Sequence, residues 1–159
     1  MLRHDAGRMP PAPADVVELL DAFQAAERVG AAAVGRWLAT CEDPRLRGGL
    51  RVIRARGLRH AALAEQRLRA LGGAPSAHVS RGLLALCEVV GDPGVSDRSK
   101  LAMLTARAPT EGRSPLATAV DRLAGDPETR ALLATIAEDE RASLAWLGKM
   151  RAVLEGEGR

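Results

Sequence analysis

The sequence predicts an all-α protein, a four-helix bundle whose third segment is broken into short helices. Apolar residues recur every three to four positions over long stretches, which is the spacing of one helix face. Alanine, leucine and arginine dominate the composition, and all three favour helices. No stretch alternates apolar with polar residues between turn-forming pairs, as the strands of a sheet would.

The first long helix is expected over residues 15–41. Asp15 and Glu18, three residues apart, have the spacing of a capping box at a helix start. The apolar stripe that follows comprises Val16, Leu19, Leu20, Phe23, Val34, Trp37 and Leu38. This stripe defines the helix face that should be buried.

The second long helix should begin at Asp43, a capping residue that is followed by Pro44 at the first helical position. Its apolar stripe comprises Leu46, Leu50, Ile53, Ala61, Ala64, Leu68 and Leu71. Gly72 and Gly73 should end the helix, because glycine tolerates a left-handed cap. The turn between the two helices is very short, so they should pack antiparallel.

The pattern in the rest of the sequence predicts three short helices and one long helix. The short helices are expected over 80–90, 96–107 and 115–124, each bounded by glycine or proline. Asp126 and Pro127 repeat the cap-plus-proline pattern and begin the last helix, whose stripe comprises Leu133, Ile136, Leu144, Leu147 and Leu154. The expected organisation is a flexible lead over 1–14, one bundle domain over 15–155 and a frayed tail over 156–159.

Composition and charge exclude several classes of protein. The net charge is +3 with acids and arginines interspersed, which indicates a mixed, solvated surface. Nucleic acid is not an expected partner, because the arginines between 45 and 59 surround one helix and aromatic residues make up only 2%. The two cysteines are expected to be small core residues of a reduced protein. No apolar run reaches membrane-spanning length and no signal peptide is apparent, so a soluble cytoplasmic protein is expected.

Three polar residues interrupt the apolar stripes. Glu27 and Glu140 lie at the centres of the first and last stripes, and His60 lies on the second. Each is near the midpoint of its helix, and midpoints meet at one level in an antiparallel bundle. Two carboxylates and an imidazole suit iron, manganese or zinc, so Glu27, His60 and Glu140 are predicted to bind one such metal ion.

Two alternatives stay open for these residues. In the first, His60 is protonated between the two carboxylates, or one carboxyl group is protonated, and no metal is bound. In the second, the bundle is rotated so that one acid is exposed in a groove. The neighbouring Glu138 and Asp139 are expected to point away from the apolar stripe into solvent.

Three segments resemble the ferritin-like superfamily, which includes rubrerythrin and bacterioferritin. They are AAER at 25–28, IRARGLRHAAL at 53–63 and IAEDERASLAWL at 136–147. The resemblance covers about 15–73 and 126–155, and it implies a ferritin-like four-helix bundle. In this family a dinuclear metal site takes one glutamate from each of two helices and a Glu-x-x-His pair from each of the other two.

The resemblance implies a degenerate site when it is carried over residue by residue. Glu27 matches the lone glutamate of the first helix. His60 is present, but Gly57 stands where its paired glutamate should be; Glu140 is present, but Ser143 stands where its histidine should be. Gly57 and Ser143 are expected to leave a small polar void beside His60 for water. On the remaining helix no acid lies on the apolar stripe, and Glu88 comes nearest to the position of a metal-binding glutamate.

These losses favour a non-catalytic binding or assembly protein with no catalytic residues. The alternative is a mononuclear metal protein, in which Glu27, His60 and Glu140 hold one iron, manganese or zinc ion for oxidase or hydroxylase chemistry. The resemblance also implies a homodimer. The sequence identifies no small-molecule substrate.

Overall fold

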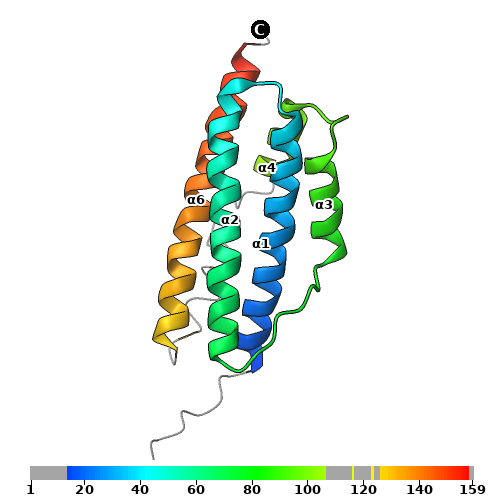
Figure 1. Ribbon diagram of the computed structural model, residues 1–159. Coiled ribbons are helices and arrows are strands. Elements are labelled where there is room, and N and C mark those ends of the chain that lie inside the picture. The colour runs from blue at the N-terminus through cyan, green and yellow to red at the C-terminus, as the bar shows by residue number, and fades with distance from the viewer. Residues whose placement is uncertain (1–13, 107–115, 117–122, 124–125, 158–159) are drawn as a thin grey trace, which may run out of the picture.

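The structure is a computed structural model that describes residues 14–106, 116, 123 and 126–157 (Figure 1). In these ranges it is helical and contains no strand, so the all-α prediction is confirmed. The described helices are α1 (Ala14–Thr40), α2 (Pro44–Ala70), α3 (Arg81–Gly91), α4 (Asp97–Ala106) and α6 (Pro127–Gly156). The helix expected over 115–124 lies outside the described residues, except for the buried Leu116 and Leu123.

The caps of α2 and α6 form as the sequence predicts. The Asp43 carboxylate accepts a hydrogen bond from the backbone N–H of Arg45 at 2.9 Å, and Asp126 accepts one from Thr129 N–H at 2.9 Å. Both carboxylates satisfy amides that have no partner within their own helix. Gly72 follows α2 with a φ of 84°, a left-handed conformation that is common after the end of a helix.

The start of α1 and the end of α6 differ from the prediction. α1 already includes Ala14, so Asp15 lies in the first helical turn, not at the cap position of a capping box. A carboxylate there still interacts favourably with the positive end of the helix dipole. α6 continues to Gly156, one residue into the tail predicted over 156–159. Arg151 Nε donates to Glu155 Oε1 at 2.7 Å, an i,i+4 pair that supports this last turn.

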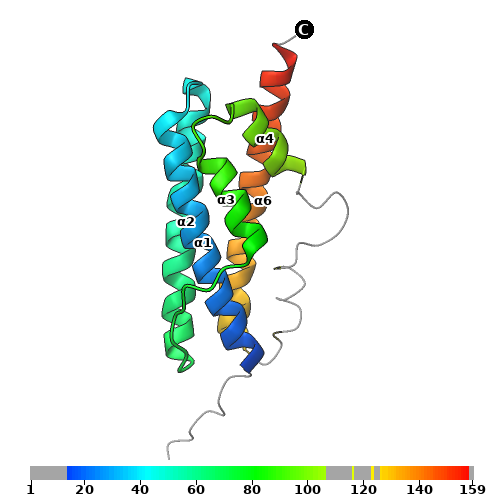
Figure 2. The same cartoon turned by 90° about the vertical axis from the view of Figure 1, so that its right-hand side faces the viewer.

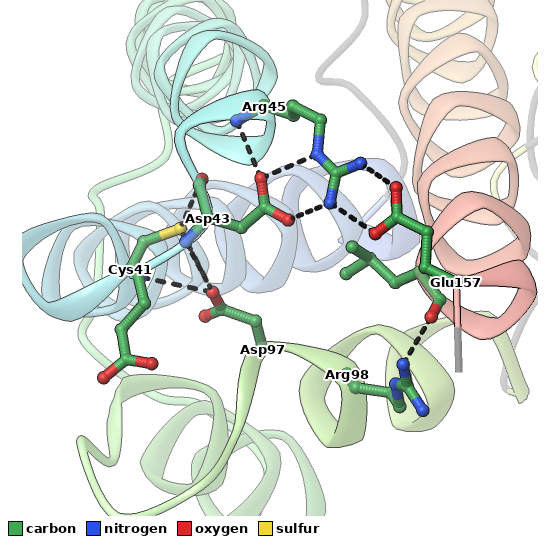
Figure 3. Close-up of polar contacts among 8 residues, drawn as sticks. Cys41, Asp43, Arg45, Asp97, Arg98 and Glu157 are labelled. Atoms are coloured by element: carbon green, nitrogen blue, oxygen red, sulfur yellow. Dashed lines mark hydrogen bonds and ion pairs between the residues drawn. The ribbon is translucent and has the colours of Figure 1, made fainter. Parts of the chain in front are cut away.

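Polar contacts define the two ends of the bundle. At one end, Arg45 at the start of α2 pairs with Glu157 just after α6, and Arg98 of α4 donates to the carbonyl of Leu154 (Figure 3). At the other end, Arg67 near the end of α2 pairs with the α6 cap Asp126 at 2.9 Å. Therefore α1 and α6 run in one direction and α2 runs in the other (Figure 1).

The helices contact one another in a defined order. α2 packs against both α1 and α6, while α3 packs on α1 and α4 packs on α6 (Figures 1 and 2). Apolar side chains from these contacts form two clusters. The cluster near the α1–α2 turn includes Ala33, Trp37, Cys41, Leu46, Leu50, Cys87, Val90, Leu101, Leu147 and Leu154. The cluster near the start of α1 includes Val16, Leu20, Ala64, Leu68, Leu116, Leu123, Leu133 and Ile136.

Candidate functional site

A polar layer lies between the two apolar clusters. On α1 the clusters involve residues up to Phe23 and from Val29, and Glu27 falls between them. On α2, His60 falls between Ile53 of one cluster and Ala64 of the other. On α6, residues 139 and 140 fall in the corresponding gap between 137 and 144. The three long helices thus bring their interior polar side chains to one level, as the sequence predicts.

His60 is the centre of this layer. Its side chain is buried, and each ring nitrogen faces a carboxylate. Nε2 lies 2.9 Å from Asp139 Oδ2, and Nδ1 lies 3.4 Å from Glu27 Oε2. Burial alone lowers the pKa of His60, but the two carboxylates outweigh it and raise the pKa above its ordinary value. The arrangement favours an imidazolium that donates a hydrogen bond from Nε2 to Asp139 and forms an ion pair with Glu27 through Nδ1.

Asp139 corrects the prediction of a solvated side chain. It lies on the edge of α6 that faces α2, where Arg56 Nε is 3.6 Å from Oδ1 while His60 contacts Oδ2. The hydrogen bond from His60 lowers the pKa of Asp139, and the charge of Arg56 lowers it further. The sequence signal for this contact is that each of the two facing helices carries two polar residues at i,i+4 spacing. Arg56 and His60 are four residues apart on α2, and Asp139 and Ser143 are four residues apart on α6.

Glu140 reaches the same layer but lacks a comparable partner. It is half-buried, and among the described residues no side chain donates a hydrogen bond to it. Burial raises the pKa of Glu140 to about 7, and repulsion from Glu27 adds to this, against a smaller opposing effect of His60. At neutral pH its carboxyl group is therefore divided between the protonated and the ionised form.

Gly57 and Ser143 do not create the polar void that was expected. Ser143 Oγ donates to the carbonyl of Asp139 at 2.9 Å and accepts from Arg56 Nη1 at 3.1 Å, so its hydroxyl is occupied. Gly57 faces α1, where an added Cβ would lie 3.4 Å from Ala31 Cβ. Gly57 borders a cavity with largely apolar walls, and Ser143 does not line it. Glycine here permits close approach of α1 and α2 beside an apolar space.

The three predicted metal ligands are close to one another, but their side chains do not all face one point. Glu27, His60 and Glu140 share one layer, but the His60 ring nitrogens are directed at Glu27 and Asp139. Within the described ranges, no group of three or more His, Cys, Asp or Glu side chains is arranged to hold a metal ion. Glu88, the candidate from the remaining helix, is exposed on α3. Metal binding by Glu27, His60 and Glu140 stays a prediction.

Asp97 forms a second polar centre, which sequence reasoning missed (Figure 3). It is the first residue of α4, and its two oxygens contact the end of α1 and the α1–α2 turn. Oδ1 accepts from Trp37 Nε1 at 2.6 Å, and Oδ2 accepts from the backbone N–H groups of Glu42 and Asp43 at 3.2 Å each. The turn amides that follow α1 are thus satisfied by a side chain from a distant part of the sequence.

The surroundings of Asp97 also explain two buried side chains. Lys100 is 1% exposed, and its Nζ lies 5.7 Å from the centroid of the Trp37 ring, within cation–π range. Burial lowers the pKa of Lys100, and the charge of Asp97 partly opposes this. Burial together with Asp97 raises the pKa of Cys41 to about 11, so its thiol stays protonated. Cys41 is therefore a core residue, as the sequence predicts.

Removal of the Asp97 carboxylate should weaken this end of the bundle. Asp97→Ala leaves the indole N–H of Trp37 and the two turn amides without their acceptor, and we expect a loss of about 2 kcal/mol of unfolding free energy. Urea unfolding followed by tryptophan fluorescence measures the change. Glu88→Ala, on the exposed face of α3, is the control and should be near neutral. Equal stability of the two variants would contradict a role for Asp97 in the fold.

Comparison of the chain with protein-family models, with curated proteins and with solved structures gives no match. Among the described helices, none combines the length and the apolar character needed to cross a membrane. A function for this protein therefore has to follow from the geometry of its two polar centres. The His60 layer is the more informative of them for function, because it buries ionisable groups in the middle of the bundle.

Proposed function

We propose that this protein is a non-catalytic, ferritin-like binding protein whose central layer is a hydrogen-bonded ion-pair link. The observation that carries the proposal is the placement of both His60 ring nitrogens against carboxylates, Asp139 at 2.9 Å and Glu27 at 3.4 Å. A ring nitrogen that donates a proton has no lone pair for a metal. The ion pairs offset the free-energy cost of burying these groups, and no metal ion is needed for this.

The connectivity of the chain supports the ferritin-like part of the proposal. Ser76, which follows α2, donates a backbone hydrogen bond to Asp21 near the start of α1. Cys87 and Val90 of α3 instead belong to the apolar cluster at the opposite end of the bundle. The chain between α2 and α4 thus crosses the length of the bundle (Figure 2). α4 then begins beside the α1–α2 turn, the end from which α2 also starts. One long crossover of this kind is a feature of ferritin-like bundles.

Glu140 favours one alternative function. Its carboxyl group lies near Glu27 and His60, and its pKa is raised first by burial and then by the negative charge of Glu27. A divalent cation in place of the proton would use Glu27, His60 and Glu140 as ligands, provided that His60 turns one nitrogen away from its carboxylate. That arrangement is the mononuclear iron, manganese or zinc protein, with open coordination positions for oxidase or hydroxylase chemistry.

Metal analysis separates the two functions. The protein is purified without chelator, and iron, manganese and zinc are quantified by mass spectrometry against protein concentration. The binding-protein proposal expects far less than one equivalent in a folded protein. About one equivalent, lost from a Glu27→Gln/His60→Gln double variant but kept in Glu138→Gln, would establish the metal protein instead. Glu138 is exposed and next to the layer, so it is a matched control.

Homodimer formation is a further part of the proposal, and it comes from the resemblance to ferritin-like bundles. Exposed apolar side chains on α2 and α3 are available for such a contact. Val52 and Leu58 of α2 are 51% and 44% exposed, and Leu84 of α3 is 41% exposed. Sedimentation velocity of the same metal-free protein gives its mass, and a monomer at micromolar concentration would refute the dimer while leaving the binding function standing.

A further inference from the structure

A cavity of about 220 Å³ lies beside the polar layer, among α1, α2, α3 and α4. Its wall is almost entirely apolar, and its larger lining side chains are Val34, Ile53, Leu83, Leu86 and Leu104. The cavity results from small residues on the two long helices. Gly30 and Ala31 of α1 and Gly57 of α2 stand where larger side chains would fill the space.

One charged residue, Glu27, takes part in this apolar wall. Glu27 Oε2 lies 3.4 Å from the position that a Cβ on Gly57 would occupy, and Gly57 itself borders the cavity. The same oxygen is 3.4 Å from His60 Nδ1, a long contact that leaves room for a second donor. Burial raises the pKa of the neighbouring Glu140, and the negative charge of Glu27 raises it further, so these two carboxyl groups lie close enough to repel each other.

We propose that this cavity binds a small apolar amine, with the apolar body among α1, α2, α3 and α4 and the ammonium group at Glu27. The inference rests on the proposed binding function and names its ligand class. An ammonium group donates to the carboxylate and offsets the repulsion between Glu27 and Glu140. An anionic ligand would be repelled by the carboxylates of the layer, and a larger cofactor does not fit a space of about 220 Å³.

The cavity volume sets the size of the ligand. An apolar protein cavity of about 150 Å³ accommodates benzene. A space of about 220 Å³ therefore takes one aromatic ring with a short chain, or an alkyl chain of similar bulk. 2-Phenylethylamine has both the bulk and the terminal ammonium group, and 2-phenylethanol is its uncharged counterpart.

The test uses the full chain, shown beforehand to be metal-free, and calorimetric titration at pH 7 with these two compounds. We expect the amine to bind at least about tenfold more tightly than the alcohol, which corresponds to a charge-assisted hydrogen bond. Glu27→Gln should reduce amine binding to the level of the alcohol while alcohol binding persists. Equal affinities in the unchanged protein, or no binding of either compound, would overturn the proposal.

Two glycine variants locate the binding. A Cβ at Gly30 meets no atom within 4 Å, and Gly30 borders the cavity, so Gly30→Leu should fill it and abolish binding of both compounds. Gly48 of α2 is likewise open but lies elsewhere, so Gly48→Leu should leave binding unchanged. Binding retained in Gly30→Leu would place the compounds outside this cavity and refute the site. A metal-free protein that binds no amine refutes this inference alone, whereas bound metal refutes the proposed function.

Discussion

Glu140→Gln should make the protein more stable above pH 7, by about 2–3 kcal/mol at pH 8. The physical reason is the raised pKa of Glu140, about 7 against an ordinary value of 4.5, which results from burial and from repulsion by Glu27. The folded protein must ionise a half-buried carboxyl group that the unfolded chain ionises in water. The amide has a similar shape and carries no charge, so this cost disappears in the variant.

The pH dependence gives a second readout of the same effect. Between about pH 4.5 and 7 the folded state holds a proton on Glu140 that the unfolded state has released, so stability falls as pH rises. The raised pKa of His60 acts in the same direction, because stability present below its unfolded pKa is lost as pH rises through the folded value. Lowered pKa values of Asp139 and Asp126 reduce stability only as pH falls through the acidic range. Stability should therefore be greatest near pH 5.

Urea unfolding at pH 5, 6, 7 and 8 measures these slopes. Glu140→Gln should remove most of the decline between pH 5 and 7, while the exposed Glu138→Gln should retain it. A large loss of stability in Glu140→Gln at pH 8 would instead show that the ionised carboxylate has a strong cationic partner. That outcome would favour the metal-binding alternative.

Gly49→Ala is expected to destabilise the protein by about 2 kcal/mol. Gly49 lies where α2 meets α6, and an added Cβ would overlap the six-membered ring of Trp146. The indole packs against the apolar cluster near the α1–α2 turn, so it cannot move aside without losing part of that packing. The helix propensity gained from alanine, about 1 kcal/mol, is too small to offset this.

The adjacent Gly48 is a matched control for this substitution. A Cβ at Gly48 meets no atom within 4 Å, so Gly48→Ala should stabilise the helix by up to about 1 kcal/mol. The two variants therefore differ in sign although they are neighbours in one helix. Urea unfolding monitored by the fluorescence of Trp37 and Trp146 measures both, and equal effects of the two changes would contradict the close approach of α2 and α6.

Much of the fold could be predicted from the sequence because its helix ends carry local chemical signals. Asp43 with Pro44 and Asp126 with Pro127 act within a few residues of themselves, so neither depends on the tertiary structure. The start of α1 follows less directly from the sequence, because an aspartate such as Asp15 suits either a cap or a first-turn position. The connection of α4 to the α1–α2 turn was not predictable, since Asp97 reaches amides more than fifty residues away.

The candidate site shows where helical periodicity stops being sufficient. Periodicity placed Glu27, His60 and Glu140 at one level, and they lie there. It could not decide which side chain of α6 contacts His60, because Asp139 and Glu140 differ by only 100° around the axis. The rotation of α6 against α2 makes that choice, and this rotation depends on packing along the whole interface. Asp139 is consequently the closer partner, at 2.9 Å from His60.

The polar layer also fixes how far each long helix can slide along its neighbours. A shift of α2 by one helical turn, about 5.4 Å, would carry His60 out of reach of Glu27 and Asp139 and place it against one of the apolar clusters. An unmatched charge there costs several kcal/mol, in addition to the cost of repacking the apolar stripes against each other. The buried ion pairs therefore favour the observed axial position of α2 over positions that are shifted by a helical turn.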